Sequence, residues 1–345
     1  MTDPTAPDPE RGGDRPEPDA DGVTAPDGRT APDAPLSAHL RAARAEFESQ
    51  VARTRADFEE ANERIKQRTG RDLIVAILIG LAIGAVLVLS LAIYKPVFLL
   101  FAFAAAVFGV FELARALQAG GRRIDLAPQL IGAAGMIVSA WTLALWQHWV
   151  VVCAAVLLVV LWRLVARLFE HDRRAGRAIW DDILTGTLVQ LYVAFAASLC
   201  VILLRQDGGQ WWVLAFIIVA VAADTGAYAT GLTFGRHPMA PRISPNKTWE
   251  GFAGAVAAAL VAGVLLAIFM LGLVWWTGLI IGATILATAT IGDLGESMIK
   301  RDLGIKDMSS WLPGHGGVLD RLDSILPSAG AALALYYFLT PLVAS

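Results

Sequence analysis

The sequence predicts an all-α, polytopic integral membrane protein with about nine transmembrane helices. Of its 345 residues, 56% are hydrophobic and only 17% are charged, and the mean hydropathy is +0.57. A soluble domain is about 45–50% apolar and about 25% charged. The apolar residues form runs of roughly 18–23, long enough to cross a hydrocarbon core about 30 Å thick. Composition and arrangement therefore predict the same fold class.

The N-terminal part of the chain differs from the rest. Residues 1–35 hold eight of the sixteen prolines, with scattered Asp, Gly and Ala, and we predict a disordered acidic tail because such a segment buries too little apolar surface to fold. Residues 36–70 are rich in Ala, Glu and Arg with a thin apolar stripe, which predicts a charged cytoplasmic helix. A short coiled coil, a helix on the membrane surface and a solvated stalk all fit this stripe.

Residues 71–345 form the predicted membrane catalytic domain. Each candidate span is an apolar run bounded by charged, glycine or proline residues. The nine spans lie near 73–94, 96–117, 126–146, 149–169, 181–204, 211–233, 251–272, 275–292 and 325–343.

The distribution of Lys and Arg predicts the orientation in the cell (inner) membrane. One set of connectors is rich in Arg and Lys, whereas the opposite set has Lys95, Arg205 and little else. Because basic connectors stay inside, we place the N-terminus and the segments 235–250 and 293–324 in the cytoplasm, and the C-terminus outside. Residues 1–35 carry nine Asp or Glu and three Arg, which is −6 against a net charge of −3 for the whole chain. The remainder is therefore about +3 and has no acidic or basic patch large enough to suggest a nucleic acid partner.

Asp224, within the sixth predicted span, is the first polar feature that suggests a site. A carboxylate at this depth is costly unless it has a partner or water, so it is either structural or part of a functional site. Nearby glycines would allow a close approach of the backbone.

A second cluster, Ser244–Pro245–Asn246–Lys247–Thr248, precedes the seventh span. Pro245 disfavours helix at Ser244, so we expect a loop that leads into a helix. Ser244, Lys247 and Thr248 supply donors near a helix N-terminus, which suits a phosphate group, although a plain helix cap is the alternative. We predict the nucleotide-binding residues to be Ser244, Asn246, Lys247 and Thr248, together with Asp224.

The third cluster, residues 293–323, combines both charge signs with paired glycines around His315. If residues 293–300 are helical, Asp293 and Lys300 share one face. Carboxylates from two segments can hold a hard cation such as Mg²⁺, and the basic residues can neutralise phosphates. We predict the catalytic residues to be Asp293, Lys300, Arg301, Lys306, Asp307, His315, Asp320, Arg321 and Asp323, and the metal ligands to be Asp293, Asp320 and Asp323.

The sequence SMIKRDLGIKDMSSWLPGHGGVLDRLD at 297–323 resembles the signature of the phosphatidate cytidylyltransferases, also called CDP-diacylglycerol synthases. The segments DTGAYATGLTFGR at 224–236 and SPNKTWEG at 244–251 resemble that family's other two recurring segments, in the same order. The resemblance covers residues 73–343 and leaves out the first 70 residues.

This resemblance implies an integral membrane enzyme that converts CTP and phosphatidate, taken from the bilayer, into CDP-diacylglycerol and pyrophosphate. It also implies a requirement for Mg²⁺ with a monovalent cation such as K⁺ beside it, and a homodimer. Residue by residue, it assigns metal binding to Asp293, Asp320 and Asp323, and phosphate contacts to Lys300, Arg301 and Lys306. Ser244 and Lys247 would belong to the nucleotide site.

Three other functions compete with this one. An ion-coupled membrane transporter would suit Asp224 and the glycine-rich spans, but charge is concentrated in connectors and no inverted repeat is evident. A CDP-alcohol phosphotransferase would carry a D-G-x-x-A-R element, which this sequence lacks. An inactive homologue would be expected to have lost one of the metal carboxylates.

Overall fold

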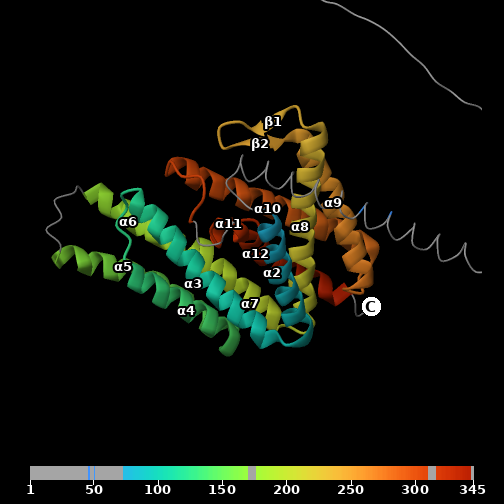
Figure 1. The fold of residues 1–345 in the computed structure, drawn as a ribbon. Helices are drawn as coiled ribbons and strands as arrows, with labels where there is room; N and C mark the ends of the chain where they lie inside the picture. The colour runs from blue at the N-terminus through green and yellow to red at the C-terminus, as the bar shows by residue number, and fades with distance from the viewer. Residues whose placement is uncertain (1–45, 47–49, 51–72, 170–175, 310–315, 343–345) are drawn as a thin grey trace, which may run out of the picture. The chain divides into compact units, whose positions relative to one another are not determined.

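The computed structural model describes residues 46, 50, 73–169, 176–309 and 316–342 (Figure 1). The chain divides into two units, Met1–Ala61 and Asn62–Ser345, and the description below concerns the second. The predicted tail at 1–35, nearly all of the predicted helix at 36–70, and His315 lie outside the described residues.

Helices dominate the described structure, as the apolar runs predict. The elements are α2 (Leu73–Ile93), α3 (Lys95–Ala119), α4 (Leu126–Thr142), α5 (Leu145–Phe169), α6 (Gly176–Val189), the π-helical turn η1 (Gln190–Phe195), α7 (Ala196–Arg205), α8 (Gly209–Phe234), β1 (Pro238–Ala240), β2 (Ser244–Thr248), α9 (Trp249–Phe269), α10 (Trp275–Asp302), α11 (Leu319–Leu322), α12 (Ile325–Leu339) and the short 3₁₀ turn η2 (Thr340–Leu342).

Helices are found at all nine predicted spans, which confirms a multi-pass, all-α membrane fold. Within the described ranges, seven helices are long and apolar enough to cross a membrane, with α6, η1 and α7 forming one of them and α11 with α12 another. The predicted span at 126–146 corresponds to a shorter apolar helix, Leu126–Thr142, and the predicted span at 73–94 coincides with α2. The count of nine is therefore not confirmed.

Small residues let α8, α9 and α10 pack with their backbones nearly in contact. A Cβ atom at Gly226 of α8 would lie 2.7 Å from the carbonyl oxygen of Gly254 on α9. Thr230 strengthens this contact, because its hydroxyl donates to the Gly226 carbonyl at 2.7 Å and to that of Gly251 at 3.3 Å. Close packing of this kind is how membrane helices gain van der Waals contact without a hydrophobic driving force.

A short antiparallel hairpin connects α8 to α9, where the sequence predicts only a loop. β1 and β2 pair with Pro238 opposite Thr248, and the hairpin lies at the end of α8 where α9 begins (Figure 1). The Trp249 amide donates to the His237 carbonyl at 2.9 Å, and His237 Nδ1 lies 2.5 Å from Glu250 Oε1. These contacts hold the hairpin against the first turn of α9.

Candidate active site

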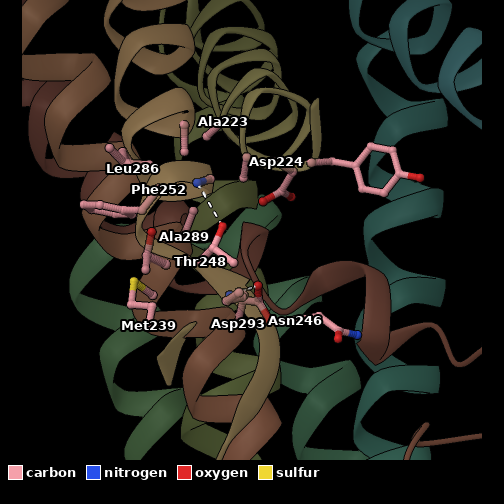
Figure 2. Close-up of a pocket in the computed structure, with 15 residues that line it drawn as sticks. Ala223, Asp224, Met239, Asn246, Thr248, Phe252, Leu286, Ala289 and Asp293 are labelled. Carbon is pink, nitrogen blue, oxygen red and sulfur yellow. Dashed lines mark hydrogen bonds and ion pairs between the residues drawn. The ribbon is translucent and has the colours of Figure 1, made fainter. Parts of the chain in front are cut away.

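A cavity of about 260 Å³ opens where α8, the hairpin, α9 and α10 meet. Its polar lining includes Asp224 from α8, Asn246, Lys247 and Thr248 from β2, and Asp293 from α10 (Figure 2). The structure thus brings together residues that lie up to 69 positions apart in the sequence, and four of the five predicted nucleotide-binding residues share one cavity with a predicted catalytic carboxylate.

The junction between β2 and α9 positions Lys247 and Thr248. The Thr248 side chain caps α9, since its Oγ1 accepts a hydrogen bond from the Gly251 amide at 3.1 Å. This cap fixes the end of β2, and the preceding side chain, Lys247, forms an ion pair with Asp293. A cation and a carboxylate therefore lie together at the N-terminal end of a helix, whose dipole favours anions.

Asp293 and Asp323 are brought close by the packing of α10 against the segment between α11 and α12. Gly292 has no side chain, which leaves room for the Asp323 carbonyl and the Pro327 ring beside it. The carboxylates of Asp293 and Asp323 interact electrostatically with each other and with Asp224. Three like charges converge on this end of the cavity.

Glu296, one turn beyond Asp293 on α10, extends the acidic cluster into the protein. It is completely buried, and its carboxyl group faces that of Asp323. Neither Glu296 oxygen accepts a hydrogen bond from a donor among the described residues. Two facing carboxyl groups need a shared proton or a cation near them, because buried carboxylates are strongly disfavoured without a counter-charge, and Lys300, 3.5 Å from Glu296 Oε2, supplies one from a single side.

Tyr192 lies in the π-helical turn η1 and faces the same cluster. Its buried hydroxyl has no hydrogen-bond partner among the described residues, and it interacts electrostatically with Glu296, Asp323 and Asp293. Single π-helical turns inside α-helices are frequent at functional sites. A phenol aimed at a carboxylate cluster adds a donor to a group of acceptors.

Lys300 and Asp320 form a second charged group beside this cluster. Lys300 Nζ lies 2.9 Å from Asp320 Oδ1 and 3.5 Å from Glu296 Oε2. The other Asp320 oxygen accepts hydrogen bonds from the Met308 amide at 3.0 Å and the Gly317 amide at 2.7 Å. Asp320 therefore fastens the segment after α10 to the start of α11.

The predicted metal set Asp293, Asp320 and Asp323 is not assembled as one group in this structure. Within the described ranges, no three His, Cys, Asp or Glu side chains are placed so that they could hold a metal ion together. Asp293 pairs with Lys247, and Asp320 with Lys300 and two amides. The feature that does fit a cation is the facing pair Glu296 and Asp323, because neither Glu296 oxygen has a hydrogen-bond donor among the described residues.

The remaining predicted site residues do not line the cavity. Arg301 Nε donates to the Ile243 carbonyl at 3.1 Å and so ties α10 to the hairpin that carries Ser244. Lys306 is exposed, and Asp307 lies beside Gly316, whose φ of 79° favours glycine. Arg321 is exposed and lines a separate apolar groove.

Glu112 was not predicted from the sequence, although it supports the whole charged segment. It is 2% exposed in the middle of α3. Its carboxylate accepts from the Ser309 hydroxyl at 2.6 Å and from the Val318 and Leu319 amides at 3.0 and 2.8 Å. A charge inside an apolar run is the signal that could have revealed it.

We expect Glu112→Ala to destabilise the protein by about 3 kcal/mol, because several buried donors would lose their acceptor. Glu112→Gln retains one carbonyl oxygen and should cost less. The check is thermal unfolding of the purified, detergent-solubilised variants. A melting temperature of Glu112→Ala equal to that of the wild type would show that these hydrogen bonds do not hold the segment.

The chain was compared with known proteins. Residues 74–339 match the model of the cytidylyltransferase family. A protein of Mycobacterium bovis named phosphatidate cytidylyltransferase is 38% identical over 276 residues, which cover 77% of this chain and 88% of the relative. A protein of the same name from Mycobacterium leprae is 39% identical over 279 residues, with 77% and 88% coverage.

A shorter match joins the chain to a relative from another bacterium. The phosphatidate cytidylyltransferase of Haemophilus influenzae is 42% identical over 135 residues, which cover 38% of this chain and 47% of the relative. The family model covers the chain from α2 to α12 and so includes α8, the hairpin, α9 and α10, which line the cavity. From the long family match and the mycobacterial relatives, we conclude that this chain belongs to the cytidylyltransferase family.

Proposed function

We propose that this protein is a phosphatidate cytidylyltransferase, which transfers CMP from CTP to phosphatidate and releases pyrophosphate. Family membership and the mycobacterial relatives support the reaction class. The observation that carries the proposal is the cavity at Lys247, where a cation, a capped helix N-terminus and carboxylates lie together. The comparisons lend no support to an ion-coupled transporter.

The chemistry requires two polyanions to meet. The phosphate monoester of phosphatidate has its second ionisation at about pH 6, so at neutral pH it is a ready nucleophile without a general base. One of its oxygens attacks the α-phosphorus of CTP, and the bond from that phosphorus to the bridging oxygen of pyrophosphate breaks. Alignment and charge neutralisation then matter more than proton transfer.

We assign Lys247 and Thr248 to the phosphates of CTP, beside Asn246 and Asp224. On binding, the Lys247 ammonium would turn from Asp293 to a phosphate oxygen, which would leave the Asp293 carboxylate available to a cation. Lys300 would neutralise charge at the other side of the cluster. Arg301 and Ser244 would position the hairpin rather than touch the nucleotide.

Glu296 and Asp323 would hold the divalent cation that this reaction class uses, and Asp293 would join them once Lys247 has turned away from it. We propose Mg²⁺, with a monovalent cation such as K⁺ beside it, because the donors are hard carboxylate oxygens. When bound, such a cation polarises the α-phosphate and stabilises the departing pyrophosphate. Asp320 would act by holding Lys300 and the loop. We further propose a cytoplasmic site, an external C-terminus and a homodimer.

The test is CTP-dependent conversion of phosphatidate by the purified, detergent-solubilised protein. We expect CDP-diacylglycerol and pyrophosphate to form in equal amounts with Mg²⁺, and neither to form after chelation or when ATP replaces CTP. Folded protein supplied with both substrates and Mg²⁺ that gives no product would refute the proposed reaction.

A further inference from the structure

A large apolar groove lies next to the charged site. Its volume is about 630 Å³, within the range of roughly 300–1,000 Å³ that is usual for ligand pockets. It is bounded by α2, α3, α8 and the residues 318–325 that begin the last span. Among the described residues that line it, Arg321 is the only charged one.

One stripe of α8 runs from this groove to the site. Leu214, Ile218 and Val221 line the groove, and their spacing of four and three residues places them on one face of the helix. Asp224 follows Val221 by three residues and so continues the same face, but it lines the cavity that also contains Lys247. From Leu214 to Asp224 the helix rises about 15 Å. The groove therefore ends where the polar cavity begins.

The start of the last span also passes from the apolar groove to the charged site within a few residues. Leu322 and Ile325 line the groove, whereas Asp323 faces Glu296 in the acidic cluster. Arg321 is exposed at this boundary. A guanidinium at the end of an apolar groove matches a molecule with a phosphate at one end and a hydrocarbon chain at the other.

We propose that this groove binds an acyl chain of phosphatidate, with Arg321 contacting its phosphate and directing the nucleophilic oxygen toward the cavity. The inference rests on the proposed function and adds the place and the entrance of the lipid substrate. Val88, Phe108 and Val221 in its lining are between 43% and 55% exposed, so an acyl chain in the groove would contact them directly.

Photochemical labelling tests the groove without depending on turnover. The full-length protein would be irradiated with a phosphatidate that carries a diazirine midway along one acyl chain, and the adducts mapped by mass spectrometry. We expect adducts on residues 214–221 of α8 and 101–108 of α3. Adducts confined to other surfaces, such as the separate apolar groove lined by Pro96, Leu100 and Trp141, or to a second copy of the chain, would overturn the proposal.

A groove-filling variant gives an independent kinetic test. A Cβ atom at Gly84 on α2 would meet nothing within 4 Å, so Gly84→Trp should be accommodated and occupy the groove. We expect the KM for long-chain phosphatidate to rise about tenfold, which corresponds to about two methylene groups of the acyl chain that are no longer buried. The KM for CTP and the turnover of dihexanoyl phosphatidate should not change. Ala85→Trp, an exposed neighbour outside the groove, is the matched control.

The two tests separate failure of the inference from failure of the proposed function. An unchanged KM for long-chain phosphatidate in Gly84→Trp, with wild-type protein active, would reject the groove alone. Absence of product from every phosphatidate in the wild type would reject the reaction, and the labelling pattern would still decide whether the groove binds the lipid.

Discussion

Asp323→Asn should reduce turnover by about 10²–10³-fold, which corresponds to the several kcal/mol that a metal ion contributes to a transition state. Asn has almost the same shape as Asp. Its side-chain oxygen can still accept from the Ser324 amide, which lies 2.7 Å from Asp323 Oδ1, so the local backbone should be retained. What is lost is one negative charge opposite Glu296.

The same substitution should leave the fold intact or slightly more stable. The new amide can donate to the Glu296 carboxylate, whose oxygens lack donors among the described residues. We therefore expect low activity, a higher Mg²⁺ concentration for half-maximal rate and an unchanged or higher melting temperature. Asp302→Asn, which removes an exposed carboxylate at the end of α10, is the matched control. Near wild-type turnover at limiting Mg²⁺ would remove Asp323 from the metal site.

The helices could be predicted from the sequence because a span needs only about 20 apolar residues, and that property is local. The prediction for residues 211–233, for example, coincides with α8 to within two residues at the start and one at the end. The hairpin at 238–248 could not be predicted in this way. Its strands are only 3 and 5 residues long and each contains a proline, so neither shows the alternation typical of a strand.

The identity of the charged segment was evident from the sequence, but its pairing was not. The sequence places Asp293, Asp320 and Asp323 near one another without showing that Lys247 neutralises the first and Lys300 the second. These pairs join residues 46 and 20 positions apart, across elements whose packing depends on Gly292 and on the hairpin. Such pairing is tertiary information, which residue type and spacing do not contain.

Glu296 and Tyr192 were both missed in the sequence analysis, but only Glu296 had a sequence feature that pointed to the site. Glu296 follows Asp293 by three residues, so a helix over 293–300 would have placed both on one face. Tyr192 had no such signal, because an aromatic residue in an apolar span is most simply part of the core. Its position depends on the π-helical turn η1, which shifts the register of the helix, and on the approach of α10.

Lys300→Met should abolish activity and also lower stability by about 3–5 kcal/mol, the usual cost of removing one partner of a buried ion pair. The Lys300 side chain is only 16% exposed and lies between Glu296 and Asp320. If the Lys300 ammonium is removed, no cation remains on its side of the cluster to neutralise the carboxylates of Glu296, Asp320 and Asp323. Lys306→Met, at an exposed position, should leave the melting temperature unchanged.

A double variant separates the two roles of Lys300. In Lys300→Met/Asp320→Asn the unpaired charge on Asp320 is gone, while the Asn oxygen can still accept from the Met308 and Gly317 amides that fasten the loop. We expect much of the lost melting temperature to return, with a coupling energy of about 0.5–3 kcal/mol between the two positions. Turnover should stay low, because the cation that neutralises phosphate is still missing. Recovery of turnover along with stability would instead mean that Lys300 serves the fold alone.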